Sequence, residues 1–253
     1  MAEPVCPKCG GSGWRIVQRE DLSAAEPCDC TPPPSLEDLE QNANLPPLYR
    51  RASFDNFVLP QDNPIEADQL GRMLLKVRSY VRYFPLGPKP GLLLIGPMGT
   101  GKTHLAVAVL RELMARGFQG LFFDYINLLE RIRSGYDPAS DSSDRTAYQS
   151  ALDVPVLLLD DLGAHRVLGW IEDTLTAIVT HRCNHQKPLI ATTNLPDPDA
   201  GDAIVQRLRG ASQVEYRITL AERIGERARS RLFEMCEVVH MPQVQDYRLR
   251  RGR

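Results

Sequence analysis

Apolar residues recur in two rhythms along residues 46–253, and each rhythm predicts a different kind of element. Short unbroken apolar runs are typical of strands that a sheet buries on both faces. Stripes of apolar residues three and four positions apart are typical of helices that bury one side. Runs and stripes alternate along the chain, which predicts an α/β domain with a five-stranded parallel sheet. The strands are expected at 91–95, 120–123, 154–159, 188–193 and 238–241, and the helices at 65–83, 105–114, 124–133, 169–182 and 224–233.

Residues 1–45, which hold four of the six cysteines, are expected to form a separate small module. Thr31-Pro32-Pro33-Pro34 is a stiff linker, and Ser35-Leu36-Glu37-Asp38 has the form of a capping box at the start of a short helix. In the larger domain, residues 136–144 are rich in Asp, Ser and Pro and are expected to form an exposed loop. The predicted division is therefore a module over 1–45 and an α/β domain over 46–253.

The composition indicates a globular protein of one ordinary domain plus something small. Hydrophobic residues make up 43% and charged residues 25% of the 253 positions, close to the average for soluble proteins. No apolar run approaches the roughly 20 residues of a membrane span. The first ten residues have neither a basic start nor an apolar core, so no signal peptide is expected. The expected compartment is the cytoplasm, with no membrane partner.

The net charge of −2 conceals a difference between the two predicted parts. Residues 1–45 carry 8 acidic and 3 basic side chains, a balance of −5, which leaves 27 basic and 24 acidic side chains, or +3, for the rest. An acidic module favours a protein surface over a phosphate backbone as its partner, whereas the remainder is compatible with nucleic acid. A solvated acidic face would explain the same charge.

The segment Gly96-Pro97-Met98-Gly99-Thr100-Gly101-Lys102-Thr103 fits the phosphate-loop pattern G-x-x-x-x-G-K-[ST] and follows the strand expected at 91–95. Glycines let the backbone turn so that successive N–H groups converge on phosphates at the start of a helix. Lys102 is expected to be exposed to the ligand and to reach the β- and γ-phosphates, while the Thr103 hydroxyl takes a position on Mg²⁺. A chance glycine-rich turn is the alternative, which the flanking strand and helix disfavour. These residues and His104 are the predicted ATP-binding segment.

Polar residues follow two of the other expected strands at their carboxyl ends, where parallel sheets bind ligands. Asp160 and Asp161 end the run at 154–159, which is the Walker B form, and Asn194 follows the run at 188–193. Asp160 is expected to hold Mg²⁺ with Thr103, and Asp161 to orient or deprotonate the attacking water. Two solvated acids at a strand end would be the other explanation. Asn194 is a candidate for holding that water.

Two further segments have both a functional and a packing explanation. Residues 49–57 are aromatic and basic and form a candidate wall beside adenine, but packing of Phe54 and Phe57 into the core explains them at least as well. The arginine-rich helix expected at 224–233, which includes Arg231, is typical of a solvated face on charge pattern alone.

Four of the six cysteines lie within the first thirty residues, in Cys6-Pro7-Lys8-Cys9 and Cys28-Asp29-Cys30. In a reducing compartment such pairs indicate zinc ligands more readily than disulfides. The predicted zinc ligands are therefore Cys6, Cys9, Cys28 and Cys30. A redox dithiol and uncoordinated cysteines are the alternatives. Cys183 and Cys236 lack such partners and are expected to be buried packing residues.

Together these motifs resemble those of the AAA+ ATPases of the DnaC/DnaI helicase-loader group, and nearly as closely those of the IstB-type transposition ATPases. The matching pieces, in the order of the family, are GPMGTGKTH, VLLLDDLGA, ATTN, GERARSRL and DYR, within residues 46–248. The resemblance implies a P-loop AAA+ three-layer αβα domain that hydrolyses ATP and self-associates through this domain. It also implies that Asn194 is the first sensor, Arg231 an arginine finger given to a neighbouring subunit, and Arg248 the second sensor.

The expected function is ATP-dependent loading of a hexameric DnaB-type replicative helicase onto single-stranded DNA, with ATP binding and hydrolysis as the switch. The zinc module resembles that of DnaI-type loaders, which implies that it contacts the helicase. The alternative is an IstB-type ATPase that assists a transposase on double-stranded DNA. Many relatives have Glu where this chain has Asp161, which implies modest turnover. A small-molecule kinase would leave Asn194, Arg231 and the cysteines without roles, and a nucleotide-binding module with negligible hydrolysis is a further possibility.

Overall fold

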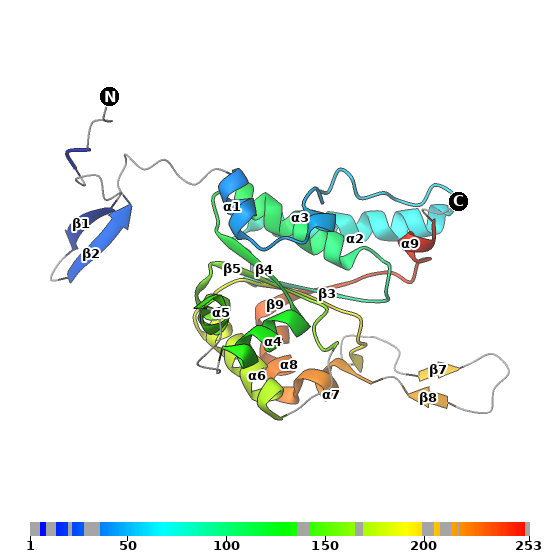
Figure 1. Ribbon diagram of the computed structural model, residues 1–253. Coiled ribbons are helices and arrows are strands. Elements are labelled where there is room, and N and C mark those ends of the chain that lie inside the picture. The colour runs from blue at the N-terminus through cyan, green and yellow to red at the C-terminus, as the bar shows by residue number, and fades with distance from the viewer. Residues whose placement is uncertain are drawn as a thin grey trace.

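A computed structural model describes residues 6–8, 14–19, 22–27, 36–135, 142–164, 169–198, 205–207, 214–216 and 218–250. Its centre is a sheet with the strand order β4-β5-β6-β3-β9 (Figure 1). All four pairings between neighbouring strands are parallel, which confirms the predicted α/β class with a five-stranded parallel sheet. The strands are β3 (Gly91–Ile95), β4 (Gly120–Asp124), β5 (Val156–Asp160), β6 (Leu189–Thr193) and β9 (Cys236–His240).

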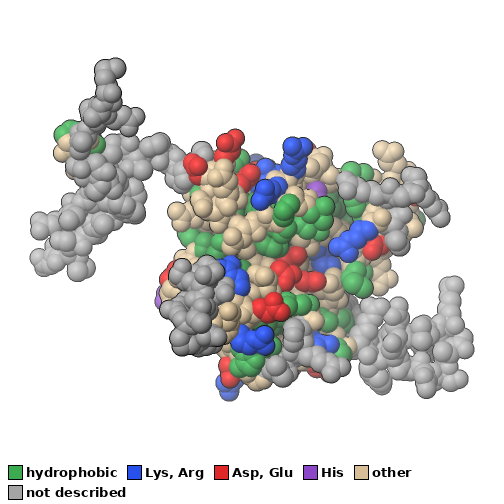
Figure 2. Space-filling view, in the orientation of Figure 1, with side chains coloured by type: hydrophobic (Ala, Val, Ile, Leu, Met, Phe, Trp, Pro, Cys, Tyr) green, Lys and Arg blue, Asp and Glu red, His purple; other side chains and the backbone are tan. Residues whose placement is uncertain are grey.

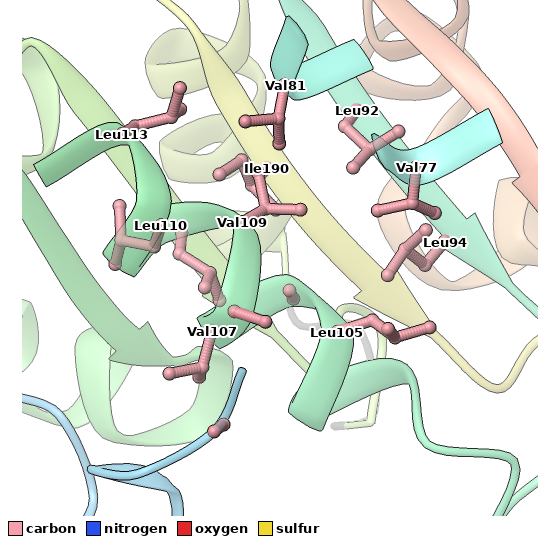
Figure 3. Packing of buried hydrophobic residues seen from close by; sticks show 14 of the residues in the cluster. Val77, Val81, Leu92, Leu94, Leu105, Val107, Val109, Leu110, Leu113 and Ile190 are labelled. Atoms are coloured by element: carbon pink, nitrogen blue, oxygen red, sulfur yellow. The ribbon is translucent and has the colours of Figure 1, made fainter. Parts of the chain in front are cut away.

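Helices cover both faces of this sheet and make three layers (Figure 1). Successive side chains of a strand point to opposite faces, so Leu92 and Leu94 of β3 pack on the side of α2 and α3, and Leu93 and Ile95 pack on the other side. Figure 3 shows Leu92 and Leu94 beside Val77 of α2. One face carries α1 (Leu36–Asn42), α2 (Pro64–Tyr83) and α3 (Lys102–Ala115); the other carries α4 (Tyr125–Ser134), α5 (Ser142–Asp153), α6 (Gly169–Asn184), α7 (Leu220–Ile224) and α8 (Glu226–Met235).

The structure corrects the sequence prediction at two places in these helices. Of the loop expected at 136–144, residues 136–141 lie outside the described residues, and residues 142–144 are helical instead, because α5 begins at Ser142 and packs against α4. The helix expected at 224–233 is interrupted, because Gly225 has a φ of +82°. That angle ends α7 and starts α8, and a Cβ at this position would lie 2.2 Å from the Glu172 carboxylate.

Two small antiparallel hairpins and one short helix complete the described residues. β1 (Trp14–Arg19) pairs with β2 (Leu22–Pro27), and β7 (Val205–Arg207) pairs with β8 (Val214–Tyr216). The sequence pattern predicted neither hairpin. A single 3₁₀ turn, η1, spans Pro47–Tyr49, and α9 (Tyr247–Arg250) lies near the end of the chain.

The surface of the domain mixes both signs of charge. On the face shown in Figure 2, Lys and Arg side chains are interspersed with Asp and Glu. The longest described helix is α2 with 20 residues, and none of the described helices combines the length and the apolar character that crossing a membrane requires.

Candidate functional site

The loop between β3 and α3 has the conformation that its glycines were expected to allow. Gly99 and Gly101 have φ angles of +72° and +92°, in the left-handed region that other residues rarely adopt. Space is equally restrictive, because a Cβ at Gly99 would lie 2.0 Å from the Asp246 carboxylate and one at Gly101 would lie 2.5 Å from the Phe57 ring. The backbone therefore forms a tight cradle directly before the positive end of α3, which suits an anion.

Lys102 opens α3, and its side chain is buried rather than exposed as the sequence suggested, with 6% of its surface accessible. Its ammonium donates hydrogen bonds to the carbonyl oxygens of Gly96 (2.8 Å) and Pro97 (2.7 Å), so it folds over its own loop. Burial lowers the pKa of Lys102 to about 8, although the nearby Asp161 and Asp160 act in the opposite direction. A cation held inside the cradle by neutral carbonyls can exchange them for phosphate oxygens.

Asp160 ends β5 beside the phosphate loop and is held from two sides. The Thr103 hydroxyl lies 3.0 and 3.1 Å from its two carboxylate oxygens, and the Thr192 hydroxyl lies 2.6 Å from Oδ1. Burial raises the pKa of Asp160, and hydrogen bonds from both hydroxyls oppose that shift. Thr103 and Asp160 thus present adjacent hard oxygen donors, the ligand type that Mg²⁺ prefers. These residues fit the metal that the phosphate-loop pattern implies.

Asp161 has a left-handed backbone conformation, which is uncommon outside glycine. Its φ is +59°, and its N–H donates to the Thr192 hydroxyl at 2.9 Å. The Asn194 amide donates to Asp161 Oδ1 at 2.5 Å. Asp enters this region more readily than most residues, and Asn44 and Gln186 also adopt it, so the hydrogen bonds rather than the φ angle single out Asp161. The structure therefore brings Asp160, Asp161 and Asn194 together as the sequence predicted.

Thr192 is the residue at this site that the sequence interpretation missed. Its hydroxyl donates to the Asp160 carboxylate and accepts from the Asp161 N–H. Only 1% of the Thr192 surface is accessible. The available signal was the threonine pair before Asn194 at the carboxyl end of a buried strand. Apolar β-branched residues suit such a strand better, so a buried hydroxyl there indicates a hydrogen-bonding task.

The C-terminal segment crosses the phosphate loop. Met241 N–H donates to the Ile95 carbonyl at 2.7 Å, and Tyr247 N–H donates to the Gly99 carbonyl at 3.0 Å. Arg248 follows at the exposed surface, near enough that its charge helps to lower the pKa of Lys102. This places Arg248 at the nucleotide site, where the family resemblance expects a second sensor; its role stays a prediction.

The two phenylalanines of the segment at 49–57 have different surroundings, one in the core and one beside the phosphate loop. Phe54 is buried in the core, and the Arg78 guanidinium lies 5.3 Å above its ring. Phe57 is half-buried beside Gly101, and its ring is tilted against the ring of His104 with 5.7 Å between centroids. Phe57 and His104 therefore lie where a wall beside the nucleotide could form, whereas Phe54 is explained by packing.

Arg231 lies on the outer side of α8, away from these groups. Its guanidinium donates to Glu234 at 2.7 Å, and about half of its side chain is exposed. The structure leaves Arg231 accessible to a neighbouring molecule, and does not bring it to Asp160 and Lys102 of its own chain through any hydrogen bond described for it.

The predicted zinc site falls largely outside the described residues. Cys6 is described and half-buried, but Cys9, Cys28 and Cys30 are not among the residues whose structure is given. Within the described ranges no group of three or more His, Cys, Asp or Glu residues could hold a metal ion. The zinc ligands stay a prediction. Cys236 is buried as expected, whereas Cys183 is only partly buried.

Comparison with known proteins links the chain to nucleotide-binding replication and transposition proteins. The family described as IstB-like ATP binding protein matches residues 74–208. The replicative helicase loader DnaC of Escherichia coli K12 is 24% identical over 171 residues, which cover 66% of this chain and 66% of DnaC. DnaI of Bacillus subtilis is 26% identical over 56% of this chain and 45% of its own length. An ATP-binding protein of an insertion sequence in Mycobacterium tuberculosis is 27% identical over 68% of this chain and 70% of its own length.

Solved structures give the same picture. A crystal structure of the DnaC helicase loader superposes with a TM-score of 0.59 and 32% identity, covering 78% of this chain and all of that one. The structure of DnaI has a TM-score of 0.58 at 22% identity, covering 79% of this chain and 95% of that one, and shows likeness of fold. The chain spans just under two thirds of the length of the curated DnaC proteins that it matches.

Proposed function

The chain belongs to the family of IstB-like ATP-binding proteins and is homologous to the DnaC and DnaI helicase loaders, and on this premise we propose that it uses ATP to load a hexameric DnaB-type helicase onto single-stranded DNA. In this proposal ATP binding and hydrolysis are a switch. Subunits associate through the ATPase domain. The homology to loaders supports the proposal, and the geometry of the site explains how the switch would work.

One observation carries the ATPase part of the proposal. A continuous chain of hydrogen bonds runs from Thr103 through Asp160 and Thr192 to Asp161 and Asn194, joining the phosphate-loop helix to the ends of β5 and β6. These hydrogen bonds lie at the carboxyl ends of parallel strands, which is where α/β sheets bind ligands. The chain connects the groups for metal binding with the groups for water activation.

Each residue would act through atoms whose positions are given above. When bound, ATP would supply the phosphoanhydride bond that is broken, and Mg²⁺ would supply positive charge to the phosphate oxygens. The Lys102 ammonium leaves the Gly96 and Pro97 carbonyls for the β- and γ-phosphates, and Thr103 and Asp160 hold the metal. Asp161 accepts a proton from, or orients, the attacking water, which the Asn194 amide helps to place. Arg231 of a neighbouring subunit stabilises the developing negative charge.

The first test of this function is capture of the partner. The full chain, with ATP and Mg²⁺, is expected to retain the replicative helicase of its host, and Lys102→Ala to weaken the nucleotide dependence of that capture. Arg72→Ala, which removes an exposed ion pair on α2, is the control. Retention of a transposase and not of the helicase would overturn the loader assignment.

The similarity to an insertion-sequence protein favours one alternative, an ATPase that assists a transposase on double-stranded DNA. The same site chemistry serves both functions, so ATPase activity alone does not separate them. The two functions are separated by comparing how single-stranded and double-stranded DNA of equal length change the ATPase activity. A loader is expected to respond to the single strand, and a transposition ATPase to the duplex.

We further propose that residues 1–45 are a zinc module that grips the helicase, and that 46–253 is the ATPase domain. Structural zinc contributes about 10–16 kcal/mol to folding in small peptides, enough to order a segment with few apolar residues. The full chain is expected to contain one zinc by elemental analysis, and Cys6→Ser with Cys9→Ser to lose both the metal and the helicase while keeping ATPase activity. A metal-free wild-type chain would contradict the zinc assignment.

A further inference from the structure

A buried ion pair ties the segment after β6 to helix α8. Asp197 has no accessible surface, and its two carboxylate oxygens accept from Arg229 Nε at 2.7 Å and Nη2 at 2.6 Å. The Arg229 guanidinium also lies 4.7 Å above the ring of Phe233. A two-point carboxylate–guanidinium pair fixes direction as well as distance, and breaking such a pair when buried leaves an uncompensated charge.

The pair joins two elements that have separate roles in the proposed ATPase. On one side, Asp197 lies three residues after Asn194, whose amide contacts Asp161. On the other side, Arg229 lies two residues before Arg231 on α8. Residues two apart on a helix point to different sides, so Arg229 faces inward to Asp197 while Arg231 faces outward. Together with the buried Ala228, Leu232 and Met235, the Arg229 contact therefore sets the rotation of α8 about its axis, and with it the direction of Arg231.

The segment between Asn194 and Asp197 is packed tightly enough to transmit a displacement. Leu195 N–H donates to the Thr193 hydroxyl at 3.1 Å, and Leu220 N–H at the start of α7 donates to the Pro196 carbonyl at 3.0 Å. A Cβ on Gly163, just after the Walker B acids, would lie 2.5 Å from Leu195 Cδ1. Close packing of this kind transmits strain rather than absorbing it.

We propose that the Asp197–Arg229 pair is a positioning pair that passes the occupancy of a chain's own nucleotide site to α8, and so governs how Arg231 is presented to a neighbouring subunit. The inference rests on the proposed ATPase function. When the Asn194 amide changes its partner from Asp161 to a water at the bound nucleotide, the three-residue segment moves and Asp197 carries Arg229 with it. A purely structural pair would stabilise α8 without responding to nucleotide.

Hydrogen exchange of the α8 amides in the full chain tests the link without relying on catalysis. Adding a non-hydrolysable ATP analogue with Mg²⁺ is expected to change exchange in wild-type α8 by roughly 5-fold, the lower end of typical coupling between sites. Asp197→Asn is expected to lose this response while its phosphate loop still gains protection, and Arg229→Lys to keep part of it. An α8 that never responds, or that responds equally in wild type and Asp197→Asn, overturns the proposal.

Glu40→Gln is the matched control, because it makes the same carboxylate-to-amide change in a partly buried pair with Arg111 between α1 and α3. It is expected to lower thermal stability while leaving the α8 response intact. Loss of the response in Glu40→Gln to the same extent would show that general destabilisation, and not the pair, is responsible. If Asp197→Asn fails to fold, Arg229→Lys decides the outcome through the same comparison.

Mixed subunits separate failure of this inference from failure of the proposed function. Asp161→Asn chains bind ATP without turning it over and can donate Arg231, and Arg231→Ala chains can turn ATP over but not donate, so their mixture is expected to recover activity. Adding Asp197→Asn to the Asp161→Asn donor is expected to reduce that recovery by about 100-fold, the scale of a 1 Å misplacement of a catalytic group. Full recovery with the modified donor overturns the pair's role. Absence of recovery with the unmodified donor would instead overturn the role of Arg231 as an arginine finger. Hydrogen exchange of α8 would then still test the role of the Asp197–Arg229 pair.

Discussion

Both ends of the central strands bury charged side chains, but the two ends use them differently. At the amino ends of β5 and β6, Arg182 has no accessible surface and donates only to backbone carbonyls in the hydrogen bonds described for it. Burial lowers its pKa to about 10, which leaves it charged at neutral pH. The acceptors are the carbonyls of Ala151, Leu152, Val154, Pro155 and Pro188, at 2.6–3.3 Å.

At the carboxyl ends, the charged groups contact groups that can be exchanged. Lys102 rests on two carbonyls of its own loop, Asp160 is held by two hydroxyls, and Asp161 accepts from an amide. Releasing the Arg182 carbonyls would take away a donor that the strand ends share, whereas releasing these partners frees side-chain groups that a ligand can take up. Burial of charge therefore does not mark a functional site by itself, and neither does a positive φ, which Gln186 in the turn before β6 (+50°) shares with Asp161 (+59°); exchangeable partners at the carboxyl ends do.

The largest expected effect concerns the carboxyl ends. Asp161→Asn keeps the size and the hydrogen-bonding reach of the side chain but removes the group that accepts a proton. Turnover of ATP is expected to fall by about 10²–10⁴-fold, the usual contribution of a general base, with nucleotide affinity and melting temperature unchanged. Steady-state ATPase assays and fluorescent-nucleotide titration check this. Equal loss of binding and turnover would show that Asp160 and Asp161 have been assigned each other's roles.

A substitution at the amino ends should change the stability of the chain and not its ATP turnover. Arg182→Met keeps a long apolar stem but removes a donor shared by five carbonyls. Leu152 and Pro188 keep another donor, Lys187 Nζ and the Leu157 N–H, and each carbonyl left unsatisfied costs about 1–3 kcal/mol. Partial relaxation makes a total loss of about 3 kcal/mol reasonable, or roughly 6–12 °C in melting temperature for a chain of this size. Lys187→Met, which removes a more exposed donor to Leu152 and Asp153, is the control and should cost less. Lost nucleotide affinity in folded Arg182→Met would contradict the comparison.

Lys102→Ala tests whether the exchangeable cation serves the ligand. Losing a charge-assisted contact to phosphate costs about 1.5–3 kcal/mol, which is roughly 10–100-fold in ATP affinity. Because Lys102 is buried, a small change in stability is also expected, but its bonds go to loop carbonyls that solvent can reach once the side chain is gone. Titration with a fluorescent ATP analogue measures the affinity. Affinity close to that of the wild type would overturn the nucleotide site.

The smallest effect is a dependence on pH. The pKa of Lys102 is lowered to about 8 in the folded chain, so the ammonium is present below that pH and is lost above it. ATP affinity is therefore expected to fall as pH rises through about 8, by less than the Lys102→Ala effect. Stability moves in the opposite direction, rising between about 8 and the ordinary lysine pKa, because the unfolded chain binds more protons there. Lys102→Arg, which stays charged, should show a flat affinity from pH 7 to 9.

Much of the fold followed from local pattern. Apolar runs located all five strands of the sheet, since strands buried on both faces require them, and G-x-x-x-x-G-K-T required one backbone path. The start of α5 and the break at Gly225 were not predicted, because both depend on what lies against the helix. The alternation of strand and helix also placed Asp160, Asp161 and Asn194 at one edge of the sheet.

The arginines show what sequence could not provide. Arg182, Arg229 and Arg231 all stand on helices, and pattern alone gives each the same charge and reach. In the structure Arg182 binds carbonyls at the strand ends, Arg229 holds Asp197, and Arg231 lies at the exposed surface. The fate of a charged side chain depends on which carbonyl, carboxylate or water lies within about 3 Å of it, and those neighbours come from distant parts of the chain. The sequence determined which residues are candidates for the chemistry, and tertiary packing alone decided that Thr192 would hold Asp160 and Asp161 and that Asp197 would hold Arg229.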